Sequence, residues 1–148
     1  MLIQLLPEQA SKYWMDIKWA IEESLPPVVG MQSDRMSNIL KSILTEEVIV
    51  WLSVEKGANG NIINGIVLTN FVTDVISGTK SLLIYCIYGY GNVHQQGVLD
   101  GIVALQKFAK SRKCNRILAY SDVPSIIKLV EGLGGETRYR LLSIPLGD

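Results

Sequence analysis

Residues 81–117 constrain the fold more than any other part of the chain. They read SLLIYCIYGYGNVHQQGVLDGIVALQKFAKSRKCNRI: an apolar strand, a turn with Gly89, Gly91 and Gly97, a helical pattern that ends in basic residues, and a second apolar strand. A helix that joins two neighbouring strands of one sheet makes them run parallel. The sequence therefore predicts a parallel β-α-β unit, in which the free N–H groups and the dipole of the helix N-terminus favour an anion such as a phosphate.

The chain before this unit predicts one strand, two helices and an antiparallel meander. Residues 2–6 form a short strand, and Pro7 begins a helix over residues 7–24. Ser33 is the predicted N-cap of a second helix. Turns rich in glycine, asparagine and serine separate three apolar runs, which we expect to be the strands of the meander: residues 48–54, 62–73 and 82–88.

The chain after the unit predicts one more helix and a final strand. Residues 116–120 are the second strand of the unit, and Pro124 begins a helix that ends at Gly134 and Gly135. Residues 138–146, RYRLLSIPL, are the predicted last strand. We therefore expect one domain over residues 1–148, a mixed α/β fold whose central sheet has an antiparallel meander followed by a parallel β-α-β unit, with helices flanking it.

Net charge and cysteine content indicate which partners and which cell compartment to expect. Fourteen basic and fourteen acidic residues give a formal net charge of zero, so we expect neither a nucleic-acid nor a membrane partner. A chain with zero net charge and 48% hydrophobic residues favours a homo-oligomer or a larger protein assembly. The two cysteines, Cys86 and Cys114, have no metal-ligand spacing and are expected to be reduced, as in the cytoplasm. Residues 1–9 lack the basic start of a secretory signal.

The order of elements from residue 48 to residue 146 resembles that of the GNAT superfamily of N-acyltransferases. LQKFAKSRKCNRILAYS is similar to the family's run from a helix that ends in alanine and a basic residue into the fifth strand. SIIKLVEGLGG resembles the end of the family's fourth helix. The substitutions within these segments resemble those of small, divergent GNAT-like proteins of tailed bacteriophages. The resemblance implies acetyl transfer from acetyl-CoA to an amine.

The resemblance also implies where acetyl-CoA would bind. In that family the fourth strand diverges from the fifth, pantetheine lies in the gap, and the pyrophosphate sits at the N-terminus of the next helix. Only Gly97 matches the family's two glycines there, because Leu99 stands at the second position. A basic run over residues 107–116 would steer an anionic cofactor or form a solvated helix end. The predicted cofactor contacts are Ile87, Tyr88, His94, Gln95, Gln96, Gly97 and Val98.

Residues at the ends of the two strands that border this gap are candidates for catalysis. Amine acetylation needs a base for the amine proton and an acid for the leaving thiolate. Tyr85, Tyr88 and Tyr90 end the fourth strand, so alternate side chains would face the gap. The predicted catalytic residues are Tyr88, Tyr120 and Asp122. A structural role stays open for each: the tyrosines as core or interface aromatic residues, and Asp122 as the N-cap of the last helix.

Two functions remain open at this point. One is an N-acetyltransferase in the cytoplasm that acts on an unidentified small-molecule or protein amine. The other is a catalytically inactive GNAT-fold structural or binding protein, such as a bacteriophage virion component, since Val130 stands where the family frequently has its general-acid tyrosine. A phage-encoded protein would lie in the host cytoplasm or in the virion.

Overall fold

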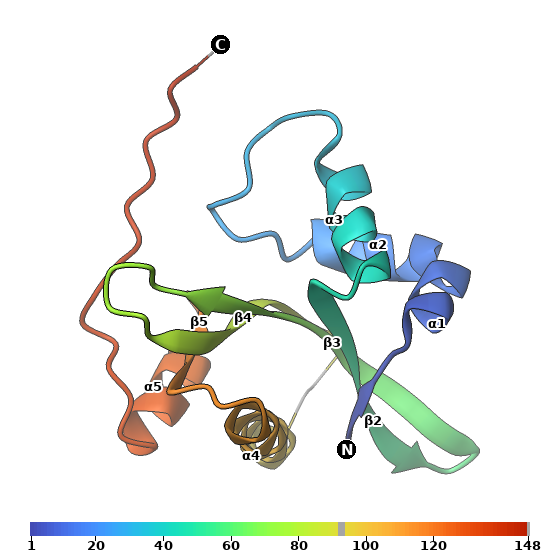
Figure 1. Cartoon of the computed structure of the whole chain (residues 1–148). Coiled ribbons are helices and arrows are strands. Elements are labelled where there is room, and N and C mark those ends of the chain that lie inside the picture. Colours follow the sequence, from blue (N-terminus) through green and yellow to red (C-terminus); the bar gives the residue numbers. More distant parts are fainter. Residues whose placement is uncertain (92–93, 148) are drawn as a thin grey trace.

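The computed structural model describes residues 1–91 and 94–147, which form a five-stranded mixed sheet with helices on both faces (Figure 1). The strands lie side by side in chain order, and the first four pair antiparallel. The last strand pairs parallel to its neighbour, as the connecting helix predicts. The five strands are β1 (Leu2–Gln4), β2 (Val48–Gly57), β3 (Gly60–Thr73), β4 (Lys80–Gly89) and β5 (Arg116–Ala119).

The described residues also form five helices, which accompany the sheet: α1 (Pro7–Lys12), α2 (Trp14–Glu22), α3 (Arg35–Leu44), α4 (Gln95–Ser111) and α5 (Pro124–Gly132). The single helix predicted for residues 7–24 is wrong, because Tyr13 leaves the helical conformation and separates α1 from α2. The break lets α1 pack against α3 while α2 packs against β4. The predicted N-cap is one residue off, since Asp34 rather than Ser33 precedes α3. None of the helices in the described ranges is long and apolar enough to span a membrane.

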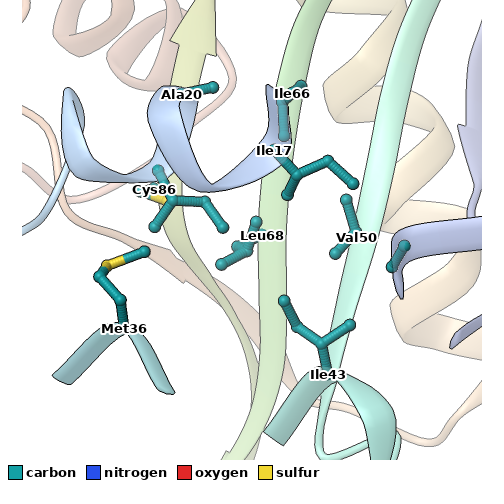
Figure 2. Packing of buried hydrophobic residues seen from close by; sticks show 10 residues of the cluster. Ile17, Ala20, Met36, Ile43, Val50, Ile66, Leu68 and Cys86 are labelled. Atoms are coloured by element: carbon teal, nitrogen blue, oxygen red, sulfur yellow. The ribbon is translucent and has the colours of Figure 1, made fainter. Parts of the chain in front are cut away.

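Helices α1, α2 and α3 cover one face of the sheet. Their buried side chains, among them Ile17, Ile21 and Ile43, pack against apolar side chains that β2, β3 and β4 present on that face. Figure 2 shows Val50, Leu68 and other members of this cluster between the helices and the strands. Such complete burial of apolar side chains is the main stabilising contribution to this half of the domain.

Helix α4 covers the opposite face and is anchored there by Phe108. The Phe108 ring meets Trp51 edge to face, with centroids 4.9 Å apart, and stacks on Phe71 at 5.9 Å. Leu105 and Ala109 of the same helix are buried against the sheet. This packing fixes α4, and therefore its N-terminus, relative to β2, β3 and β4.

The final strand predicted for residues 138–146 is wrong. The segment is described, but it contains no strand or helix. Its large apolar side chains are exposed, with Leu142 at 85%, Ile144 at 83% and Leu146 at 96%. The amino-acid pattern of a strand is present, but a strand forms only where another strand supplies hydrogen-bond partners, and no described strand pairs with this segment.

Candidate functional site

The site begins where β4 and β5 stop pairing. Their parallel ladder runs from the pair Ser81–Arg116 to the pair Ile84–Ala119, whereas β4 continues to Gly89. On its other side β4 changes register with β3, since Leu68 pairs with Cys86 but Thr69 pairs with Ile84. Tyr85 is therefore the extra residue of a β-bulge, which bends and twists its strand. The bulge coincides with the end of the β4–β5 ladder, so residues 85–89 have no strand partner on the β5 side within the described chain.

The bulge also changes which way the tyrosines of β4 point. Without it, Tyr85 and Tyr88 would lie on opposite faces of the sheet. Instead Tyr85, Tyr88 and Tyr90 all pack against the cluster beneath α1, α2 and α3, on the same side as buried Cys86. The alternation on which the prediction for the three tyrosines rests is therefore interrupted at Tyr85.

Tyr85 meets Tyr120 at the point where the two strands part. Their rings lie edge to face, with centroids 6.3 Å apart, and both side chains are half-buried. Burial raises the pKa of the Tyr85 phenol above its ordinary value, with smaller contributions from Cys86 and Tyr120. The phenol of Tyr85 thus stays protonated at neutral pH, so it can donate a proton or a hydrogen bond but cannot act as a base.

Tyr88 belongs to a second aromatic group. Its ring lies edge to face against Trp19 of α2, at 5.3 Å, and against Tyr90, at 5.1 Å. Burial raises the pKa of the Tyr90 phenol, with smaller contributions from Tyr88 and Asp16. Ile87 follows the alternation of the strand and lies on the other face, 37% exposed. The Tyr88 side chain is thus held by packing, which agrees with the alternative that Tyr88 is a core aromatic residue.

The N-terminus of α4 is open for a ligand. His94 is its N-cap, and no side chain caps the helix in the described structure. The first backbone N–H groups of a helix have no partner within it, and no described residue bonds those of Gln95, Gln96 and Gly97, so these groups are available within the described structure. A side chain at Gly97 would meet nothing within 4 Å. His94, Gln96 and Gly97 line a hollow of about 350 Å³, whereas Gln95 is exposed and Val98 half-buried.

The rest of this hollow is rich in hydrogen-bond acceptors. Glu55 of β2, Asn64 of β3 and Asp100 of α4 line it. The side-chain oxygen of Asn64 is buried and has no partner among the described residues, and the Gln96 amide donates to Asp100 at 2.9 Å. No lysine or arginine lines the hollow among the described residues. An anion here would be bound by the backbone N–H groups and the helix dipole, with His94 as the neighbouring side chain in place of a lysine or arginine.

Two further expectations concern α4: the role of the basic run and the effect of Leu99 on the anion position. The basic run lies at its C-terminal end, about 25 Å from His94 for a helix of this length. Arg112 of that run lies over the Phe108 ring at 5.0 Å, which agrees with a packed and solvated helix end. Leu99 is half-buried and does not line the hollow, so its side chain leaves the space above Gly97 open.

Asp122 lies exposed between β5 and α5. The prediction that it caps α5 is wrong, because Val123 is the N-cap and α5 has no side-chain cap. Ser121 accepts a hydrogen bond from the Val123 N–H instead, at 3.2 Å. The structure thus brings three of the predicted cofactor contacts together at α4 and places Tyr120 at the gap. It also places Tyr85, one of the three tyrosines considered from the sequence, at the gap, through a bulge that the apolar run over residues 82–88 does not reveal.

Solved structures of acetyltransferases resemble this domain over its whole length. An aminoglycoside acetyltransferase from an uncultured soil metagenomic sample has a TM-score of 0.70 and 16% identity, covering 99% of this chain and 98% of its own. The aminoglycoside N-acetyltransferase AAC(6')-Iy, in complex with a bisubstrate analogue, has a TM-score of 0.67 and 16% identity, with 100% and 98% covered. The ribosomal-protein-alanine N-acetyltransferase of Brucella melitensis biovar Abortus 2308 has a TM-score of 0.63 and 13% identity, with 99% of each chain covered.

No protein-family model and no curated protein matches the sequence. The structural similarity spans the meander, the parallel β4–β5 pair and the helix between them. At this level of identity the matches establish the architecture. The chain has the fold of the GNAT superfamily of N-acyltransferases.

Proposed function

We propose that the protein is an N-acetyltransferase that uses acetyl-CoA. The observation that carries the proposal is the coincidence of the Tyr85 bulge with the end of the β4–β5 ladder, beside an uncapped α4 N-terminus. A GNAT-fold neighbour, AAC(6')-Iy, has been solved both with CoA and with a CoA bisubstrate analogue. In this chain, the gap beyond the end of the β4–β5 ladder is a suitable place for the extended, amide-containing arm of the cofactor.

Backbone and shape support acetyl-CoA at this place, whereas the acidic side chains of Glu55 and Asp100 in the hollow oppose its pyrophosphate. Backbone groups of residues 85–89, Ile87 and Tyr88 included, lack a strand partner on the β5 side and can pair with the amides of the pantetheine arm. The N–H groups from Gln95 to Gly97 would hold the pyrophosphate, and the open space above Gly97 permits its close approach. His94 and Val98 border this position. Bound acetyl-CoA supplies an acetyl thioester that an amine can attack.

The side chains beside the gap have distinct roles in the proposal. Tyr120 donates a proton to the leaving thiolate. The protonated phenol of Tyr85, whose ring contacts that of Tyr120, assists Tyr120 in this step from the other side of the gap. Asp122 is an exposed carboxylate just beyond β5 and accepts the amine proton through water. Tyr88 has a positioning role rather than a role in proton transfer, because its ring is fixed between Trp19 and Tyr90. The acceptor is a small-molecule or protein amine.

Calorimetry and thermal unfolding with acetyl-CoA test the proposal. Occupancy at about 100 times the dissociation constant should raise the free energy of unfolding by about 2.7 kcal/mol. Gly97→Glu should abolish this effect by placing bulk and negative charge at the phosphate position. The control is Gly132→Glu, which makes the same change at another helical glycine with open space around it. Absence of binding at millimolar acetyl-CoA would refute the proposal.

A second candidate is a GNAT-fold binding protein without catalysis. Two observations favour it: Val130 stands half-buried on α5 where the resemblance implies a general-acid tyrosine, and Tyr88 is engaged in packing. This candidate predicts acetyl-CoA turnover no faster than buffer across a panel of amines. A virion role within it predicts that the native protein stays with a large assembly through purification.

A further inference from the structure

The turn between β3 and β4 presents two large aliphatic side chains to solvent. Val75 and Ile76 are 90% and 94% exposed, and the turn projects from the sheet (Figure 1). Neither side chain belongs to a described core cluster. Two neighbouring aliphatic side chains in this position are stabilised only when another molecule removes them from water.

This turn is held in one shape by its own hydrogen bonds. The Asp74 carboxylate accepts from the N–H of Ile76 at 3.4 Å, from the N–H of Ser77 at 3.2 Å and from the Ser77 hydroxyl at 2.6 Å. The Gly78 N–H donates to the Asp74 carbonyl at 2.7 Å. Three successive N–H groups are thus bonded within the turn. Because these donors already have partners, the turn can enter a medium without acceptors at a lower cost than a turn whose N–H groups need water.

Basic side chains lie beside the same turn. The Lys80 ammonium donates to the Arg112 carbonyl at 2.8 Å, and the Asn115 N–H donates to the Lys80 carbonyl at 2.8 Å, so the end of α4 lies against the start of β4. Six residues, here called the basic surface, come from these two segments: Lys80, Lys107, Lys110, Arg112, Lys113 and Arg116. All except the half-buried Lys80 are exposed, and none forms an ion pair with a described residue.

The charge at this end of the sheet differs from the charge of the whole chain. Asp74 and Glu46 are the acidic side chains that share a hydrogen bond or a hollow with this region, Asp74 within the turn and Glu46 beside Arg112. The basic surface outnumbers them, so the local charge is positive although the formal net charge is zero. The expectation of no membrane partner rests on the net charge, which does not describe this local field.

We propose that this end of the domain binds the surface of a bilayer that contains anionic lipids, with Val75 and Ile76 inserted at the headgroup boundary and the basic surface on the headgroups. Binding at a bilayer surface strengthens with buried apolar area and with attraction to anionic lipids, and this end offers both. The aliphatic pair favours lipid over nucleic acid, because nucleic acids use basic side chains for their phosphates and aromatic side chains for their bases. The basic surface lies at the opposite end of α4 from His94, so a bilayer and acetyl-CoA can bind at once.

Co-sedimentation with vesicles tests the electrostatic part of the proposal. The full chain should bind vesicles of phosphatidylcholine with about 30% phosphatidylserine at least about tenfold more tightly than vesicles of phosphatidylcholine alone. Lys110→Gln/Lys113→Gln should weaken binding to the anionic vesicles by about fivefold per residue. The matched control is Lys12→Gln/Lys56→Gln, which removes two exposed charges outside the basic surface and should bind as the parent chain does.

The same measurement tests the aliphatic pair. Val75→Ser/Ile76→Ser should weaken binding to the anionic vesicles by about tenfold or more, because no apolar area is left to bury. The matched control is Ile62→Ser/Ile63→Ser, which changes two neighbouring exposed side chains at the other end of β3 and should leave binding unchanged.

A polarity-sensitive maleimide dye reports insertion directly. On Ile76→Cys, in a Cys114→Ser background, its emission should move to shorter wavelength when anionic vesicles are added, whereas on Ile63→Cys in the same background it should stay unchanged. Equal affinity for the two kinds of vesicle, or unchanged binding of Val75→Ser/Ile76→Ser, would overturn the proposal. Tighter binding to duplex DNA than to anionic vesicles would indicate a nucleic-acid surface and overturn it as well. None of these measurements involves acetyl-CoA, so their outcome is independent of the proposed acetyltransferase activity.

Discussion

The indole N–H of Trp51 donates a hydrogen bond to the Thr69 hydroxyl across β2 and β3, at 2.8 Å. Thr69 has no exposed surface, and Trp51 is 7% exposed beneath α4. A buried donor without a partner costs far more than the net value of the bond, because the group loses water and gains nothing in return. The pair therefore satisfies the one polar group that the large Trp51 side chain brings into the core.

Thr69→Val should lower the free energy of unfolding by about 1–3 kcal/mol, because it leaves the Trp51 indole unpaired at nearly constant volume. Thr69→Ser keeps the hydroxyl and should lower it less. Adding Trp51→Phe to Thr69→Val removes both partners, so the double variant should lose less than the sum of the single variants. Denaturant unfolding measures the parent chain, Thr69→Val, Thr69→Ser, Trp51→Phe and the double variant, and strict additivity would argue against this hydrogen bond.

Phe108→Ala should destabilise the domain by about 3–5 kcal/mol, since it empties the space between Trp51 and Phe71. Val103→Ala, on the same helix at a 37% exposed position, is the control and should change little. If α4 is anchored as described, Phe108→Ala should also weaken acetyl-CoA binding from a distance. A Phe108→Ala protein as stable as Val103→Ala would contradict the anchoring role.

Alkaline pH should destabilise the protein through Cys86. Burial raises the pKa of this thiol above 9.0, with smaller opposing effects of hydrogen bonds from Ser24 and Leu68. The folded state then binds the proton more tightly than the unfolded state, so the contribution is complete below pH 9.0 and is lost as the pH rises through the folded pKa. Cys86→Ala should flatten the fall in unfolding free energy above pH 9.0. Equal slopes in the parent chain and in Cys86→Ala would contradict this account.

The sequence was sufficient for features that depend on local pattern and chain connectivity. The parallel pairing of β4 and β5 follows from the crossover helix between them, and the structure confirms this pairing. The bulge at Tyr85 could not be predicted, because an uninterrupted apolar run contains no alternation that an extra residue would disturb. Residues 138–146 show the opposite failure: their composition suits a strand, but pairing depends on a partner that local sequence does not specify.

Tyr120→Phe tests the proposed proton donor at the gap. It removes only the hydroxyl and keeps the edge-to-face contact with the Tyr85 ring, whose centroid lies 6.3 Å away. If Tyr120 protonates the leaving thiolate, kcat should fall by about 10²–10⁴-fold, while the dissociation constant of acetyl-CoA and the unfolding free energy stay close to those of the parent chain. Tyr85→Phe, which removes the supporting hydroxyl, should lower kcat less. Tyr90→Phe is the control, because its ring packs on Tyr88 rather than at the gap. Steady-state kinetics with an amine substrate measure kcat, and equal kcat for Tyr120→Phe and Tyr90→Phe would place the proton donor elsewhere.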